Sequence, residues 1–242
     1  YFNNINNNLL SLLFLFLLVV SIFITAERAN FITIVFFVFL FILFLSLQNK
    51  KLSLIILAFL LSSITIISLS NNQLSKRMIT NTLFGELKHF RIVPDKSYLN
   101  KDSHYFAHYS AAYQIFQKNK LFGIGLKNFR NYCDDDSFNS EIHPTWHNRK
   151  CATHPHSFYF EILSEIGLIG FFILISFFIF SFYKIFRMFV IRKDNYLIIS
   201  SLIILSYFIP FLPKGSFFTN WNAIIFWTVF AFIYANYIKL KK

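Results

Sequence analysis

The chain has 242 residues, of which 56% are hydrophobic and 21% aromatic, including 35 phenylalanines. A soluble domain of this length cannot bury so much apolar surface, so the composition excludes an ordinary soluble fold and indicates that lipid solvates much of the chain. The formal charge of +12 is compatible with nucleic-acid binding. The lysines and arginines lie mainly at the ends of apolar runs, where they anchor membrane helices, so we expect no nucleic-acid partner.

Six apolar runs, uncharged apart from Glu165 in the fourth and each close to the length that crosses a bilayer as a helix, alternate with polar connectors. They cover residues 9–25, 29–47, 52–69, 162–183, 196–213 and 217–238. This pattern predicts an all-α, polytopic membrane protein with six transmembrane helices and one long loop region. We divide the chain into three transmembrane helices (1–69), a loop region with the active site (70–157) and three further transmembrane helices (158–242).

The first run is preceded by neither an initiator methionine nor a basic segment, since the chain begins at Tyr1. A secretory signal peptide carries a basic segment before its apolar core. We therefore interpret the first run as a transmembrane helix and the sequence as part of a longer protein whose N-terminal half precedes it.

The lysines and arginines predict the orientation, because short cytoplasmic loops are enriched in them. Alternation of six spans places the basic connectors 48–51 and 184–195 and the basic tail 239–242 on one side. We expect that side to be the cytoplasm, and region 70–157 to lie on the opposite face. The modest basic excess of this region does not conflict, because long loops cross the membrane regardless of charge.

All seven histidines and both cysteines lie within residues 70–157, so chemistry that uses either residue type belongs there. Long connecting segments are usually functional or disordered, and the aromatic content favours order. We expect short helices, one of them near residues 104–118, followed by a turn at Gly123-Ile124-Gly125 and an irregular stretch to Ser157.

Glu27 and Arg28 form a polar turn between the first two runs, on the same face as the long region. An ion pair there would serve as an interfacial anchor that reaches the lipid headgroups. The planar fork of donors on an arginine is equally suited to binding a phosphate. The residues alone support both interpretations.

His154-Pro155-His156-Ser157 leads directly into the fourth apolar run, so the two imidazoles are expected where the loop meets the membrane. A helix N-terminus stabilises anions, so the charge of a diphosphate could be received here. The positive electrostatic field of the helix N-terminus also explains Glu161 and Glu165 as ordinary partners of the helix dipole. This is the interpretation that we favour for the two glutamates.

Several potential metal ligands follow one another in the second half of the long region. They are His143, His147, Cys151, His154 and His156. Their spacing allows a zinc site. In an oxidising, non-cytoplasmic compartment, a disulfide between Cys133 and Cys151 is the more favourable use of the cysteines. We expect the disulfide and no metal, with the zinc site as the alternative.

Three segments occur in a distinctive order: Thr25-Ala26-Glu27-Arg28, residues 112–129 around the glycine turn, and residues 154–170, in which the histidines precede Glu165-Ile166-Gly167-Leu168-Ile169-Gly170. Together they resemble the O-antigen ligase and polymerase superfamily, and the resemblance extends from Leu9 to the last span. The histidine segment is the most specific of the three, whereas the glycine turn alone is a weak signal.

The resemblance implies an inverting, metal-independent glycosyltransferase without a cofactor, embedded in the bacterial inner (plasma) membrane with its active site facing the periplasm. Its donor would be a glycan on an undecaprenyl-diphosphate carrier. The acceptor would be a lipid A-core sugar in a ligase, our leading expectation, or another carrier-linked repeat in a polymerase. A transporter segment ranks lower because the spans carry no charged residue other than Glu165, and a metal-binding membrane protein rests on the histidines alone.

By this resemblance, Arg28 matches the arginine that binds the carrier diphosphate, and His156 matches the histidine that activates the acceptor hydroxyl. His154 and Glu161 would support the site.

Two positions depart from the family pattern. Where the family has a second phosphate-binding arginine, this chain has His104, and Arg91 is the nearest arginine upstream. Ser157 stands where asparagine is more common, and both residue types can cap a helix.

Overall fold

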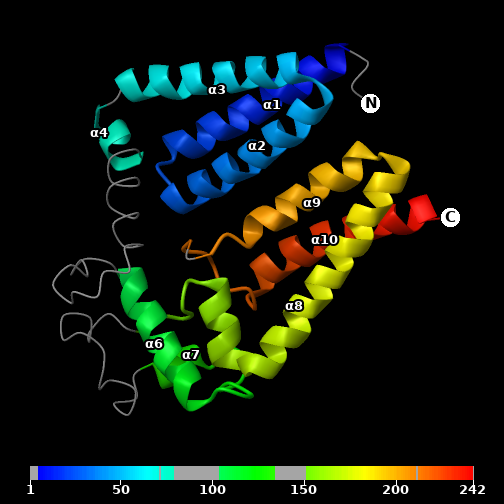
Figure 1. Ribbon diagram of the computed structural model, residues 1–242. Coiled ribbons are helices and arrows are strands. Elements are labelled where there is room, and N and C mark those ends of the chain that lie inside the picture. Colours follow the sequence, from blue (N-terminus) through cyan, green and yellow to red (C-terminus); the bar gives the residue numbers. More distant parts are fainter. Residues whose placement is uncertain (1–4, 71, 79–103, 134–150, 211, 242) are drawn as a thin grey trace. The chain divides into compact units, whose positions relative to one another are not determined.

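The computed structural model describes residues 5–70, 72–78, 104–133, 151–210 and 212–241 (Figure 1). Every regular element among these residues is a helix, which confirms the predicted all-α fold class for this part of the chain. Helices suit a lipid environment because they satisfy their backbone groups within one segment. The chain divides into two compact units, Tyr1–Leu99 and Asn100–Lys242, and each is described by itself.

The first unit packs three apolar helices against one another, followed by a short helical turn. These elements are α1 (Ile5–Ile24), α2 (Arg28–Gln48), α3 (Lys50–Ser70) and α4 (Asn72–Ser75). Helix α2 is apolar on every side, yet only Val38, Phe41 and Leu45 are buried within the protein. A helix that is apolar all round and mostly exposed is typical of a membrane span.

The second unit contains the remaining described helices. They are α6 (His104–Lys118), α7 (Phe129–Tyr132), α8 (Phe158–Arg192), α9 (Asn195–Tyr207) and α10 (Asn220–Lys241). Helices α8, α9 and α10 pack against one another, and α6 packs on α8 (Figure 1). Aromatic rings dominate the shared core, where the ring centroids of Phe178 and Phe226 lie 5.5 Å apart in an edge-to-face contact. The unit therefore joins a helical bundle to the elements that carry the histidines.

Helix α8 consists of two helical segments, 158–166 and 168–192, which meet at Gly167. The backbone of Gly167 has φ 65° and ψ −169°, a conformation that essentially only glycine adopts. Figure 1 shows the resulting change of direction near the start of α8. The short first segment therefore belongs with the histidine loop, and the long second segment belongs with the bundle.

Three helices in the described part of the chain are long and apolar enough to cross a membrane: α2, α8 and α10. Helix α9 is apolar but has only 13 residues, so the predicted span at 196–213 is helical only as far as Tyr207. Pro210 explains this early end, because proline lacks an N–H and disfavours helical backbone in the residue before it. The count of six spans stays a prediction.

Candidate functional site

Three imidazoles and a phenol gather where the segment 151–157 meets α8. The ring centroid of His156 lies 4.1 Å from that of His154, 5.3 Å from that of His108 and 5.4 Å from that of Tyr105. His108 and Tyr105 come from α6, about fifty positions earlier in the chain. The fold therefore assembles a polar cluster that sequence spacing alone does not reveal.

The backbone at His156 is strained, with a φ of 58°. Non-glycine residues rarely adopt positive φ, at a cost of about 1–3 kcal/mol, and such outliers cluster at functional sites. Four non-glycine residues in the described part of the chain have positive φ. One of them is His156 itself, and another is Ala26, two positions before Arg28.

The backbone of Lys214 holds both histidines of the loop. Its N–H donates to the carbonyl oxygen of His156 at 2.8 Å, and its own carbonyl oxygen accepts from Nε2 of His154 at 3.2 Å. Because a carbonyl can only accept, the His154 ring carries a proton on Nε2, and Nδ1 accepts from the hydroxyl of Thr153 at 2.9 Å. His154 is thereby fixed in one orientation beside His156.

Burial lowers the pKa of His156 to about 4, and repulsion by His154 and then by His108 adds to this effect. The pKa of His154 is also lowered, chiefly by burial. Both imidazoles are therefore neutral at physiological pH. A neutral imidazole can accept a proton, which is the state that a general base requires.

The side chain of Lys214 reaches the end of α9. Its ammonium donates to the carbonyl oxygens of Ser206, at 3.1 Å, and Tyr207, and Nζ lies 4.6 Å from the centroid of the Tyr207 ring. Positive charge is favourable at a helix C-terminus, where carbonyl groups lack partners. Burial lowers the pKa of this ammonium to about 7. Lys214 therefore connects the histidine segment, through its backbone, with α9, through its side chain.

Glu161 ties the first turn of α8 to the same connection between α9 and α10. One carboxylate oxygen accepts from the hydroxyl of Ser216, and the other accepts from the N–H of Phe217 at 2.8 Å. Glu161 and Ser216 are both buried. The helix-dipole interpretation is thus incomplete, because the carboxylate also fixes the turn that contains Lys214.

Glu165 makes a comparable connection to the segment after α6. Its carboxylate accepts from the backbone N–H of Lys127 at 2.7 Å and from that of Phe129 at 3.3 Å. The carboxylate and Phe129 are buried. The two glutamates of the short α8 segment therefore fasten it on two sides, Glu161 to the α9–α10 connection and Glu165 to the α6–α7 connection.

The bend at Gly167 interrupts two backbone hydrogen bonds of α8, and the segment 120–125 replaces them. The two N–H groups after the bend donate to carbonyls of this segment, and the two carbonyls before the bend accept from its N–H groups. The four bonds are Leu168 N to Lys120 O (2.8 Å), Ile169 N to Leu121 O (3.2 Å), Ile124 N to Ser164 O (3.0 Å) and Gly125 N to Glu165 O (2.8 Å). An unsatisfied backbone group is costly in lipid, so this exchange makes the bend compatible with a membrane helix.

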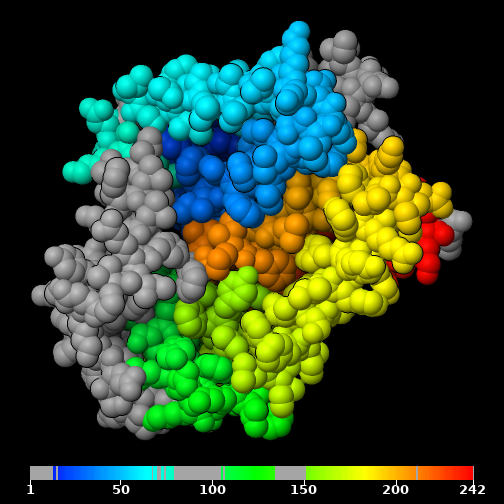
Figure 2. Space-filling model, viewed as in Figure 1, coloured from blue at the N-terminus to red at the C-terminus, as the bar shows by residue number. Residues whose placement is uncertain are grey.

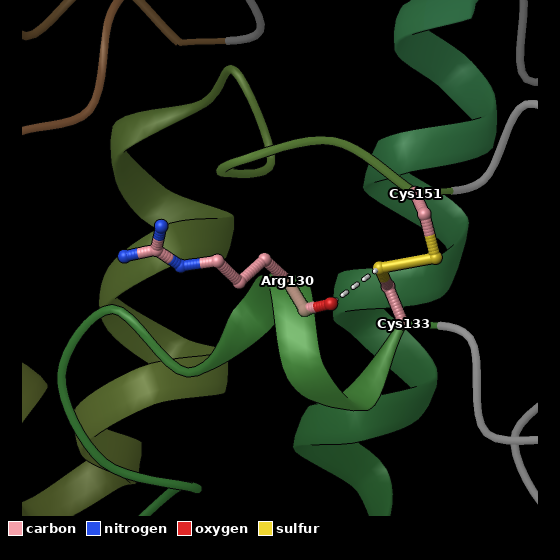
Figure 3. The surroundings of a disulfide bond; sticks show 3 residues. All are labelled: Arg130, Cys133 and Cys151. Carbon is pink, nitrogen blue, oxygen red and sulfur yellow. Dashed lines mark hydrogen bonds between the residues drawn. A yellow bond between two sulfur atoms is a disulfide. The ribbon is translucent and has the colours of Figure 1, made fainter.

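A disulfide joins Cys133, at the end of α7, to Cys151, at the start of the histidine segment, with a Cα–Cα distance of 5.2 Å (Figure 3). The carbonyl oxygen of Arg130 lies 3.6 Å from the Cys133 sulfur. The Arg130 guanidinium points away from the disulfide in Figure 3. The bond links the end of α7 to the histidine segment, and Cys151 is thereby not a free thiolate for metal binding.

The remaining predicted residues are placed only in part. Arg28 is the first residue of α2 in the first unit. His104 begins α6, but its side chain lies outside the described part of the structure. Arg91, His143 and His147 lie outside the described residues altogether. The residues that do have described side chains contain no group of three potential metal ligands that could hold an ion.

Ser157 occupies the N-cap position of α8, but its hydroxyl makes no capping hydrogen bond. Its backbone carbonyl accepts from the N–H of Glu161 at 2.9 Å. Two further contributors, Lys214 and Ser216, were missed by the sequence interpretation. A short Lys-Gly-Ser connector carries no recognisable motif, so only its contacts reveal its role.

The family model of the O-antigen ligases matches residues 13–175, which is more than half of the chain. No curated protein and no solved structure matches it. The matched residues include Arg28, the glycine turn and the histidine segment, whereas Lys214 lies beyond them. The resemblance drawn from the sequence motifs is thus confirmed, and the chain, a membrane protein with apolar spans, belongs to the O-antigen ligase family.

Proposed function

We propose that this chain is the catalytic part of a glycosyltransferase that moves a glycan from an undecaprenyl-diphosphate carrier to a sugar of lipid A-core. The family membership supports this reaction class. The observation that carries the assignment is the neutral imidazole of His156, half-buried at the start of α8 and held by the Lys214 backbone. His156 acts as the general base.

The proposed reaction is a single inverting displacement. The oxygen of the acceptor hydroxyl attacks the anomeric carbon of the donor sugar as its proton passes to His156. The bond between the anomeric carbon and the diphosphate oxygen breaks, and the carrier diphosphate leaves with the electron pair. The imidazolium then returns its proton to water, so the reaction consumes no cofactor.

The anionic donor would also tune the base. A negative charge close to the imidazoles favours their protonated form and so raises the pKa of His156 from its low value in the free protein. A base that is neutral before the donor binds, and a stronger proton acceptor afterwards, suits a step that begins with a neutral hydroxyl.

Arg28 is the proposed diphosphate ligand, with His104 or Arg91 as the second. A guanidinium binds phosphate oxygens through two parallel hydrogen bonds, which an ammonium cannot reproduce. Arg28→Lys should therefore reduce donor affinity and turnover even though the charge is retained. Normal activity in Arg28→Ala would mean that the arginine is only an interfacial anchor.

The proposed topology has six spans, with region 70–157 in the periplasm and the basic connectors in the cytoplasm. The disulfide supports an oxidising compartment for this region. Cysteines introduced at Asn100 and Asn195 provide the test in intact cells. An impermeant thiol reagent should label the first and not the second, and labelling of the second would overturn the topology.

The decisive test of function uses the purified full-length protein with a radiolabelled lipid-linked donor. Transfer to lipid A-core that is lost in His156→Ala would support the ligase assignment. Transfer only to a second carrier-linked repeat would instead identify a polymerase. Failure to use either acceptor, with the disulfide and the helical content intact, would contradict the proposed function.

A further inference from the structure

The segment that follows α6 exposes large apolar side chains at its tip. Phe122 is 73% exposed, and Leu121 and Leu126 are more than half exposed. All three lie within six residues of one another in a turn that carries Gly123 and Gly125. A cluster of this kind is unfavourable in water and marks a surface that contacts an apolar partner.

Positive charge surrounds this apolar tip. Lys120, Lys127 and Arg130 are exposed, and the stretch from residue 118 to residue 132 contains no acidic residue. Three aspartates follow at 134–136, outside the described residues. Exposed apolar side chains flanked by lysine and arginine suit the boundary between anionic headgroups and acyl chains.

The segment is also fixed next to a membrane-spanning helix. The carbonyl oxygen of Leu121 accepts from the N–H of Ile169, in the first turn of the long α8 segment. That segment is a candidate span and exposes Ile169, Phe172 and Ile173. In Figure 2 the green surface of α6 and the residues after it adjoins the yellow-green start of α8. The apolar tip therefore lies beside a surface that lipid covers.

We propose that residues 120–130 form an interfacial anchor that rests in the membrane surface beside α8. Leu121, Phe122 and Leu126 insert among the acyl chains, and Lys120 and Lys127 contact the anionic headgroups of phospholipids. The four backbone bonds to α8 hold the anchor rigidly, so it would set the height of the histidine cluster above the bilayer. This inference rests on the membrane location of α8 and does not depend on the proposed transferase reaction.

Depth-dependent quenching tests the insertion. In the full-length chain, Phe122 is replaced by cysteine, which is labelled with an environment-sensitive fluorophore. The labelled protein is then reconstituted in vesicles of phosphatidylglycerol and phosphatidylcholine. Phe172→Cys supplies the lipid-facing reference, and Gln117→Cys, exposed on α6, supplies the aqueous reference. Nitroxide-labelled lipids should quench position 122 as they quench 172, and iodide should not. Quenching of 122 by iodide alone, or by neither agent because protein covers it, would overturn the proposal.

The charge contribution is tested separately. Lys120→Gln is combined with Lys127→Asn, because asparagine tolerates the positive φ of 59° at position 127. With the label at 122, this double variant should lose lipid quenching in vesicles that contain phosphatidylglycerol and change little in pure phosphatidylcholine. The labelled chain that keeps Lys120 and Lys127 should show a similar loss of lipid quenching at about 1 M salt, where surface charges are screened. If the double variant were quenched as strongly as the chain with both lysines in both lipid compositions, the headgroup contact would be eliminated.

Discussion

Gly167 and Gly123 lie in direct contact, and a Cβ built on Gly167 would lie only 2.6 Å from the amide nitrogen of Gly123. The same Cβ would lie 2.4 Å from the carbonyl oxygen of Leu121, and a Cβ on Gly123 would lie 2.4 Å from the carbonyl carbon of Glu165. Both glycines have positive φ. Two motifs about forty residues apart in the sequence are therefore two sides of one backbone contact.

Gly167→Ala should destabilise the second unit by about 3 kcal/mol or more, because it adds a backbone clash to a conformation that only glycine adopts readily. The matched control is Gly215→Ala, whose Cβ would meet only side-chain atoms of Asn222 and no backbone, so relieving this contact costs at most the hydrogen bond from the Asn222 amide to the carbonyl oxygen of Ser216. The thermal unfolding midpoints of the two variants in the same detergent provide the measurement. Similar midpoints would show that the contact does not support the bend.

Glu161 is expected to act as a positioning residue. Glu161→Ala leaves the buried N–H of Phe217 without its acceptor, at a cost of about 1–3 kcal/mol, and frees the turn that contains Lys214, so turnover should fall. Glu161→Gln keeps an oxygen for Phe217 and an amide that can donate to Ser216, so it should restore most of the stability and turnover. Glutamine as inactive as alanine, in a stably folded protein, would instead identify Glu161 as an acid or base in the reaction.

His156→Ala should lower turnover by on the order of 10²–10⁴-fold, the usual contribution of a general base, with nearly unchanged donor binding. His154→Ala should have a smaller effect, because this ring is fixed by Thr153 and the Lys214 carbonyl and its proposed role is to support His156. Steady-state kinetics and a donor-binding assay on the purified variants make the comparison. Small, equal losses accompanied by lower thermal stability would mean that the two imidazoles are only structural.

The pH dependence should differ between kcat/KM and kcat. The base works in its neutral form, and its pKa in the free protein is about 4, so kcat/KM should fall only as the pH drops through about 4, well below the usual histidine range. A donor diphosphate bound as proposed would raise the pKa of His156, so the acid limb of kcat should lie at higher pH. An acid limb at the same pH in both profiles would contradict this influence of the donor.

The Cys133–Cys151 disulfide closes a short loop with a sequence separation of 18 residues. By loop entropy alone, its removal in a Cys133→Ser, Cys151→Ser double variant should cost about 3 kcal/mol. The measurements are thermal unfolding and mass spectrometry of non-reduced peptides, which should contain the linked pair. Stoichiometric zinc in the purified protein, lost with activity on chelation, would favour the metal site instead.

Some features of the fold could be read directly from the sequence. The long apolar runs determine that this is a helical membrane protein, because a helix of about 20 apolar residues is the simplest way to cross a bilayer without unpaired backbone groups. The helix at 104–118 and the glycine turn after it were also predictable, and α6 has these bounds. The end of α9 at Tyr207 was missed because hydropathy does not register Pro210.

The site was predictable only where it formed a local motif. His154, His156, Glu161 and Arg28 stand in family-specific segments, so the sequence by itself was enough to recognise the family and to name these residues as candidates. Only the tertiary structure decided that His108 joins the cluster, that Lys214 holds both loop histidines, and that Glu161 reaches Ser216. The physical reason is that these are contacts between side chains and backbone groups about fifty or sixty residues apart, formed when buried polar groups find partners, and no spacing along the chain encodes them.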